Sequence, residues 1–261
     1  MNNIYLELTK EFNTGKTRAI ISSGQAVVLH RLAVMSKDGD WIVREDSEVI
    51  EHILSVLSNH GARYRFGAPF NIRWMSGGWS AHFEFSYDGI RVRTDFVTRP
   101  PRVSDSLRAK LWQIYDGKDT PFVDVKTLAE LKKTNREKDY IVIGELARLM
   151  IDPKDQFLYS RSARDLIFLS EKYPDLIAEL GNQRQVLKKI SEGENKLEEA
   201  LDAERRDFIH ANEKRLEMYM KAAEKWLSLW PEIQKEIEGL PLLESHKIIV
   251  KKAEGILPFR V

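Results

Sequence analysis

Strict alternation of apolar and polar residues marks two neighbouring segments in the first half of the chain. Residues 79–87 (WSAHFEFSY) and residues 90–98 (IRVRTDFVT) both follow the period of two that is typical of β-strands. Asp88 and Gly89 lie between them, and Asp-Gly is a strong signal for a two-residue hairpin turn. The pattern therefore predicts an antiparallel β-hairpin.

Shorter apolar runs predict further strands, and apolar residues at helical spacing predict helices between them. A cap at Asp46 or Ser47 begins one of these helices, and Gly61 ends it. The predicted strands are residues 18–22 and 40–45, and the predicted helices are residues 24–32, 48–60, 104–115 and 127–150, the last as one helix or two.

From about residue 154 onward the pattern is helical throughout. Residues 192–229 form a long, highly charged amphipathic segment, typical of a helix that packs against a partner or serves as a platform. Asp152-Pro153 is the best candidate for a domain boundary. The sequence thus predicts an α/β (α+β) domain over residues 1–152, with a mixed sheet flanked by helices, and an all-helical domain with a long helix over residues 153–261.

Composition narrows the chemistry. The 261 residues include 41 Lys and Arg against 40 Asp and Glu, and this balance argues against a globally basic, nucleic-acid-coating protein. The absence of cysteine excludes disulfides, zinc–thiolate sites and thiol catalysis, and favours a reducing compartment. The first residues do not resemble a signal peptide, and no apolar run approaches the roughly 18 residues of a membrane span. We therefore expect a cytoplasmic protein with no membrane partner.

A pair of acids opens the strand predicted near residue 40. Side chains two apart in a strand point to the same face, so Asp38 and Asp40 are expected to project together. Two neighbouring carboxylates favour a hard divalent cation such as Mg²⁺, which binds one or two protein carboxylates together with substrate phosphates. An ordinary polar turn is the alternative, because Lys37-Asp38-Gly39-Asp40 is also common loop composition.

Small residues precede this pair at the junction of a strand and a helix. Ser22, Ser23 and Gly24 lie where free backbone N–H groups and the positive end of the helix dipole suit a phosphate. Gly24 allows close approach of the backbone, and the serine hydroxyls can donate to a phosphate. A simple serine cap is the alternative. Followed 14 residues later by paired carboxylates, the turn predicts a site for a nucleoside triphosphate and its metal, with Lys37 as a further contact.

A third carboxylate is expected on the predicted hairpin. In residues 90–98 the apolar side chains share one face, and Asp95 lies on the other face with two arginines. There Asp95 could join the metal site or act as a general base. Two alternatives remain: Asp95 pairs with Arg91 or Arg93, or Glu84 on the adjacent strand takes its place.

These residues resemble the nucleotidyltransferase fold of the DNA polymerase β superfamily, in which a small-residue turn and a short helix precede an Asp-x-Asp pair. Here Gln25 follows Gly24, and Gly39 separates the two acids. The resemblance implies Mg²⁺-dependent transfer of a nucleoside monophosphate from a triphosphate such as ATP to a hydroxyl of RNA, protein or a small molecule. It implies that Asp38 and Asp40, with Asp95, hold the metal, that Ser23 and Gly24 bind the β and γ phosphates, and that Asp95 activates the acceptor.

A second stretch, KKTNREKDYIVIGEL, carries Lys132, Arg136, Lys138 and Asp139. On one helix Lys132, Arg136 and Asp139 would share a face and steer phosphates, or their charges would pair internally. The stretch resembles a helix of small bacterial nucleotidyltransferases of the abortive-infection toxin type, which implies an antitoxin or a second copy of the chain as partner. A degenerate protein of this fold, acting only as a nucleotide-binding or interaction scaffold, is the alternative function.

Overall fold

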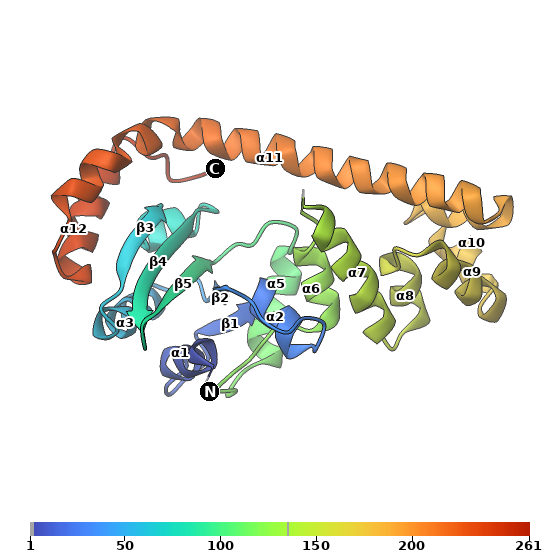
Figure 1. Cartoon of the computed structure of the whole chain (residues 1–261), viewed down its shortest axis with the longest axis horizontal. Helices are drawn as coiled ribbons and strands as arrows, with labels where there is room; N and C mark the ends of the chain where they lie inside the picture. Colours follow the sequence, from blue (N-terminus) through green and yellow to red (C-terminus); the bar gives the residue numbers. More distant parts are fainter. Residues whose placement is uncertain (1–2, 135) are drawn as a thin grey trace. The chain divides into compact units, whose positions relative to one another are not determined.

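The computed structural model describes residues 3–134 and 136–261, which fold as two compact units (Figure 1). The first unit contains the residues up to Val123 together with Glu217–Val261, and the second unit contains Asp124–Leu216. The long helix α11 (Glu194–Glu236) contributes residues to both. The boundary predicted at Asp152-Pro153 therefore lies inside the second unit, where Asp152 caps a helix.

A five-stranded mixed sheet forms the centre of the first unit. Its strands are β1 (Ala19–Ser22), β2 (Asp38–Val43), β3 (Arg63–Gly67), β4 (Ser80–Tyr87) and β5 (Ile90–Val97), in the order β1-β2-β5-β4-β3. Strands β2 and β5 pair in parallel, and the other pairs are antiparallel. The predicted hairpin is confirmed, and its turn residues Asp88 and Gly89 have φ angles of 50° and 75°. Strand β3 was not predicted.

Helices surround this sheet, and aromatic residues fill the core between them. The helices of the first unit besides the end of α11 are α1 (Ile4–Phe12), α2 (Ser23–Leu29), α3 (Ser47–Asn59), α4 (Ile72–Met75), α5 (Asp105–Ile114) and α12 (Leu242–Ala253). Trp41 and Phe96 from the two parallel strands stack with ring centroids 5.3 Å apart, and Phe12 of α1 packs edge-on against Trp41. All three rings are fully buried, so this face of the sheet is fixed toward the core.

Strand β3 lies at the edge of the sheet, where unpaired backbone groups need partners. Two indoles of α11 supply donors: Trp226 Nε1 donates to the carbonyl of Gly67 at 2.9 Å, and Trp230 Nε1 donates to that of Arg65 at 3.2 Å. The predicted long helix is thus confirmed, and its last third covers a sheet edge.

The residues after α12 pack against the segment before β4. Trp74 Nε1 donates to the carbonyl of Leu257, and Trp79 Nε1 donates to that of Pro258. A Cβ atom on Gly77 would lie 1.6 Å from the carbonyl oxygen of Phe259, so only glycine allows this approach. Trp79 is therefore a core residue of the first unit.

The second unit is entirely helical among its described residues, as the sequence predicts from residue 154 onward. Its elements are α6 (Val125–Leu131), α7 (Glu137–Leu149), α8 (Pro153–Tyr159), α9 (Ala163–Lys172), α10 (Asp175–Leu180), the 3₁₀ helix η1 (Gln185–Glu192) and the start of α11. Phe157, Leu166, Leu187 and Leu197 are fully buried in its core. Within residues 3–134 and 136–261, no helix combines the length and apolar character needed to cross a membrane.

A buried histidine gives the first unit a pH-dependent stability. His246 Nδ1 accepts a 2.7 Å hydrogen bond from the Tyr64 hydroxyl, and burial lowers the pKa of His246 to about 4. The unfolded chain takes up a proton below about pH 6.5 and the native chain does not, so stability present above that pH is lost as the pH falls toward 4. We expect His246 to account for a loss of roughly 3 kcal/mol in the free energy of unfolding between pH 7 and pH 4.

Urea unfolding at both pH values measures this loss. The variant His246→Gln keeps a hydrogen-bond acceptor for Tyr64 but does not titrate, so its loss should be smaller by the same amount. An equal loss in both proteins would contradict the prediction.

Candidate active site

The strand register brings the predicted acids onto one face of the sheet. Strands β2 and β5 pair Asp40 directly with Asp95, and Asp38 with Arg93. Partners in register project to the same side, and side chains two apart do so as well. Asp38, Asp40 and Asp95 therefore share the face opposite to Trp41 and Phe96.

Asp38 carries an oxygen that the protein itself does not satisfy. Among the described residues its buried Oδ1 atom accepts no hydrogen bond, and Arg93 Nη1 forms a long ion pair with it at 3.6 Å. A buried carboxylate oxygen without a donor is unfavourable unless a cation or donor completes it. Such an oxygen could accept a cation or a donor from a bound ligand.

The carboxylate of Asp95 is held by two cationic or polar neighbours. Arg65 Nη2 donates to Asp95 Oδ1 at 2.8 Å, and His82 Nδ1 lies 2.7 Å from the same oxygen. With the Nδ1 proton directed to Asp95, Nε2 of a neutral His82 accepts from the Ser80 hydroxyl at 2.8 Å. Among the described residues, no three Asp, Glu or His side chains are gathered closely enough to hold a metal ion.

The sequence did not single out Arg65, His82 or Ser80. A signal existed for two of them, because Ser80 and His82 occupy alternate positions of the predicted strand 79–87, and the hairpin register pairs His82 with Asp95. Gly67 is also required here, since a Cβ atom on it would lie 2.6 Å from His82 Cδ2. Arg65 comes from β3, the strand that was not predicted.

Glu84, the alternative to Asp95, is occupied by arginines. Its side chain is buried and accepts hydrogen bonds from Arg63 and from Arg91. Burial raises the pKa of Glu84, but the hydrogen bonds from Arg91 and Arg63 outweigh burial and hold this pKa below its usual range. Glu84 is therefore a paired structural carboxylate, and the arginines expected to compete for Asp95 bind Glu84 and Asp38 instead.

The small-residue turn lies beside these acids, because β1 pairs Ser22 with Asp40. Ser22 Oγ donates to the carbonyl of Asp40 at 3.3 Å, and Ser23 adopts a left-handed φ of 52°. A Cβ atom on Gly24 would lie 2.3 Å from Ser36 Oγ, so glycine allows the loop before β2 to approach α2. Gln25 bonds the carbonyl of Ser36 from the same side.

Lys37 is exposed immediately before Asp38. Its carbonyl accepts a 2.8 Å hydrogen bond from the Tyr5 hydroxyl, which fixes the backbone at the start of β2. The ammonium of Lys37 remains a predicted nucleotide contact.

Lys132, Arg136 and Lys138 belong to the second unit. The prediction that Lys132, Arg136 and Asp139 share one face of a single helix is wrong. Lys132 is the C-cap of α6 and Arg136 the N-cap of α7, so they belong to two different helices. Lys132 Nζ donates to Asp139 Oδ1 at 3.1 Å, and Arg136 Nε donates to Oδ2 at 2.7 Å. Thr134 completes the cluster by donating to Oδ2. Three of the predicted residues thus pair internally, while Lys138 is exposed.

Burial raises the pKa of Asp139, but Lys132, Thr134 and Arg136 together hold it below its usual range. The variant Asp139→Asn leaves the buried ammonium of Lys132 without a carboxylate. We therefore expect it to lower the free energy of unfolding of the second unit by about 3 kcal/mol. Chemical denaturation followed by circular dichroism measures this change.

The matched control is Lys138→Gln, which changes an exposed neighbour and should alter stability by less than about 0.5 kcal/mol. The double variant Lys132→Met/Asp139→Leu removes both buried charges and should recover much of the loss. Equal stability of Asp139→Asn and the control would contradict the buried pairing.

Comparisons with known proteins complete the description of the site. No family model matches the chain, and no curated protein matches it. The chain is similar to two solved structures from Helicobacter pylori. One is a candidate nucleotidyltransferase, 12% identical, with a TM-score of 0.38, a match that covers 80% of this chain and 94% of the other. The second is the protein JHP933, 11% identical, with a TM-score of 0.38 and coverages of 84% and 95%.

Proposed function

We propose that this protein is a nucleotidyltransferase that moves a nucleoside monophosphate from a nucleoside triphosphate to a hydroxyl acceptor. The observation that carries the proposal is the register of β2 with its two neighbours. It aligns Ser22, Asp40 and Asp95 across three strands and leaves Asp38 on the same face. A polyphosphate at the Ser22–Gly24 turn would lie beside carboxylates that suit its metal.

Asp38 and Asp40, with Asp95, are the proposed carboxylate ligands of Mg²⁺, and the bound triphosphate would have to supply further oxygens, because the described side chains alone do not gather into a three-ligand site. When bound, the ion neutralises the charge that develops on the transferring phosphoryl group. The unsatisfied Oδ1 of Asp38 supports this role.

Asp95 would serve as the general base for the acceptor. Both of its described hydrogen bonds go to Oδ1, from Arg65 and His82. Among the described residues Oδ2 has no recorded hydrogen bond, so it can accept the proton of an incoming hydroxyl. Arg65 and His82 would orient the carboxylate.

Substrates and partners extend the proposal. A nucleoside triphosphate such as ATP is the donor, and RNA, a protein hydroxyl and a small molecule are the candidate acceptors. Lys37, next to Asp38, would supply positive charge for the nucleotide. The exposed Lys138 of the second unit stays a predicted nucleotide contact. An antitoxin or a second copy of the chain is the expected protein partner, and the cytoplasm the expected location.

One observation favours a second candidate function, binding of a nucleotide without transfer. The ion pair between Arg65 and Asp95 occupies an acid that an active site of this class needs. A protein that binds a nucleotide without transferring it would keep the Ser22–Gly24 turn and the acidic face of the sheet, with Asp95 still paired to Arg65.

Labelled nucleoside triphosphates, incubated with Mg²⁺ and either total RNA or the protein alone, test the two functions. Asp38→Asn and Asp40→Asn should each reduce transfer by at least about 100-fold, which corresponds to about 2.7 kcal/mol of barrier. Asp88→Asn is the matched control, because it removes an exposed carboxylate in a turn that asparagine tolerates.

Unchanged thermal unfolding of all three variants is required for this comparison. Full transfer by Asp38→Asn and Asp40→Asn would refute the metal role. Absence of transfer together with Mg²⁺-dependent stabilisation by a nucleotide, about 2.7 kcal/mol at a hundredfold excess over Kd, would establish the second candidate instead.

A further inference from the structure

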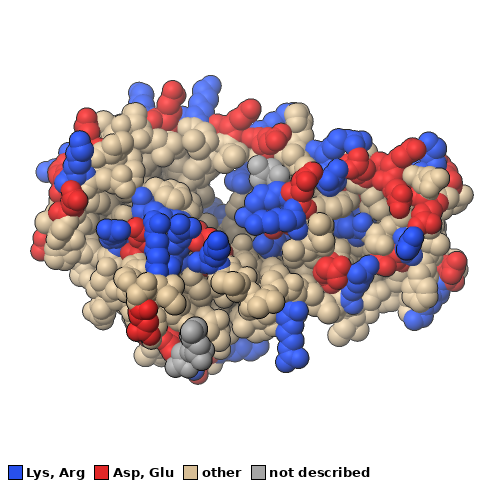
Figure 2. Space-filling model, viewed as in Figure 1, with Lys and Arg blue, Asp and Glu red and all other residues tan. Residues whose placement is uncertain are grey.

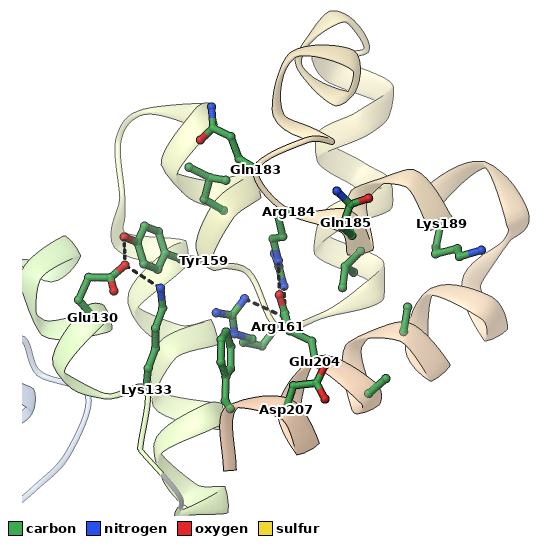
Figure 3. A pocket seen from close by; sticks show the side chains of 15 residues that line it. Glu130, Lys133, Tyr159, Arg161, Gln183, Arg184, Gln185, Lys189, Glu204 and Asp207 are labelled. Carbon is green, nitrogen blue, oxygen red and sulfur yellow. Dashed lines mark hydrogen bonds and ion pairs between the residues drawn. The ribbon is translucent and has the colours of Figure 1, made fainter. Parts of the chain in front are cut away.

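The second unit contains a cavity of about 610 Å³ that the proposed transfer reaction does not use (Figure 3). Its walls come from α6 and the turn after it, α8, the segment up to η1, and the start of α11. All of its lining residues lie between Glu130 and Phe208, within one compact unit. The volume is in the range of sites that hold small molecules.

Two buried guanidinium groups share a single carboxylate in this wall. Arg184 binds Glu204 through two hydrogen bonds of 2.9 and 2.8 Å. Arg161 reaches the same carboxylate only with Nη1, at 3.4 Å. The side chains of Arg161 and Arg184 are 3% and 6% exposed. One buried positive charge is therefore left without a carboxylate of its own, which is costly in a protein interior.

Arg161 also keeps unused donors. Its Nε atom is buried and has no hydrogen-bond partner among the described residues, whereas its Nη1 donates to the carbonyl of Ser160. Burial and the nearby Arg184 lower the pKa of Arg161 to about 10. The group therefore remains a cation at neutral pH, and its unused N–H groups suit an anionic oxygen acceptor.

A second cation faces the same space. Figure 3 shows the Arg161 guanidinium between Glu204 on one side and the ammonium of Lys133 on the other. The ring of Phe208 lies under both cations, 5.4 Å from Arg161 Cζ and 5.8 Å from Lys133 Nζ. Lys133 is neutralised by Glu130 at 2.7 Å. Asp207 also lines the cavity, but it is exposed, so water screens its charge.

We propose that this cavity binds a small phosphate-bearing molecule, with the phosphate between Arg161 and Lys133. A phosphate supplies the negative charge and the acceptor oxygens that Arg161 lacks. The remaining volume, walled by Tyr159 and Phe208, leaves room for an organic group such as a nucleoside. This site is independent of the proposed transfer reaction, whose residues lie on the sheet of the first unit.

Titration calorimetry of the full chain with AMP, and separately with inorganic phosphate, tests the proposal. EDTA in all samples removes the divalent cations that the acids of the first unit would need. We expect AMP to bind, and Lys133→Gln and Arg161→Gln each to raise its Kd at least about tenfold. Lys196→Gln is the matched control, since Lys196 is an exposed lysine of the second unit, on α11, that pairs with Glu199 and does not line the cavity, and it should leave the Kd unchanged.

Circular dichroism shows which variants fold, and Lys133→Gln, a half-buried surface change, keeps the test valid if Arg161→Gln does not. Asp40→Asn should bind AMP normally, which separates this site from the proposed active site. Tighter binding of AMP than of phosphate identifies an organic phosphate as the ligand, and equal binding identifies free phosphate. No binding of either compound at 1 mM, or AMP binding that Lys133→Gln leaves unchanged, would overturn the proposal.

Discussion

The candidate site depends on one constraint, the parallel pairing of β2 with β5 above a stacked pair of aromatic rings. Trp41 and Phe96 are buried against each other on the core face. Because side chains alternate along a strand, this burial forces Asp40 and Asp95 to the opposite face in register. A slip of one residue would bury the acids and expose the rings, so the same packing energy that stabilises the sheet also positions the carboxylates.

Basic side chains balance the charge of this face. Arg65, Arg93 and Arg91 each contact an acid of the sheet. Figure 2 shows Lys and Arg gathered, with acidic atoms among them, over the part of the first unit where Figure 1 draws the sheet. A bound polyphosphate would compete with the carboxylates for these guanidinium groups.

Much of this fold could be predicted from local sequence patterns. The elements that were missed depend on pairing between distant parts of the chain. The hairpin, the caps of α3 and the long helix follow from alternation, turn chemistry and helical spacing alone. Strand β3 was missed because its sequence, RYRFG, places two arginines in a short segment, and only pairing with β4 and cover from α11 makes it a strand. The division into units was equally inaccessible, because Glu217–Val261 returns to the first unit.

The candidate site likewise combines features that local patterns predict with features that depend on long-range pairing. Asp38, Asp40 and Asp95 could be placed on one face by period-two reasoning, whereas the partners of Asp95 depend on which strands are neighbours. The charges around Asp139 were expected on one helix, but Lys132 lies at the end of α6 and Arg136 at the start of α7, and both reach Asp139 from separate helix ends. Residue spacing predicts which side chains share a face only when those residues belong to one uninterrupted helix or strand.

The interleaved order of the two units has a consequence for biosynthesis. The second unit is one continuous stretch, Asp124–Leu216, so all of its residues leave the ribosome before Glu217 does. The first unit cannot be completed before the second has been made, because the indoles that cover β3 and the segment packed against Gly77 follow the second unit in the chain. Until then β3 is an uncovered sheet edge of the kind that can pair with another chain.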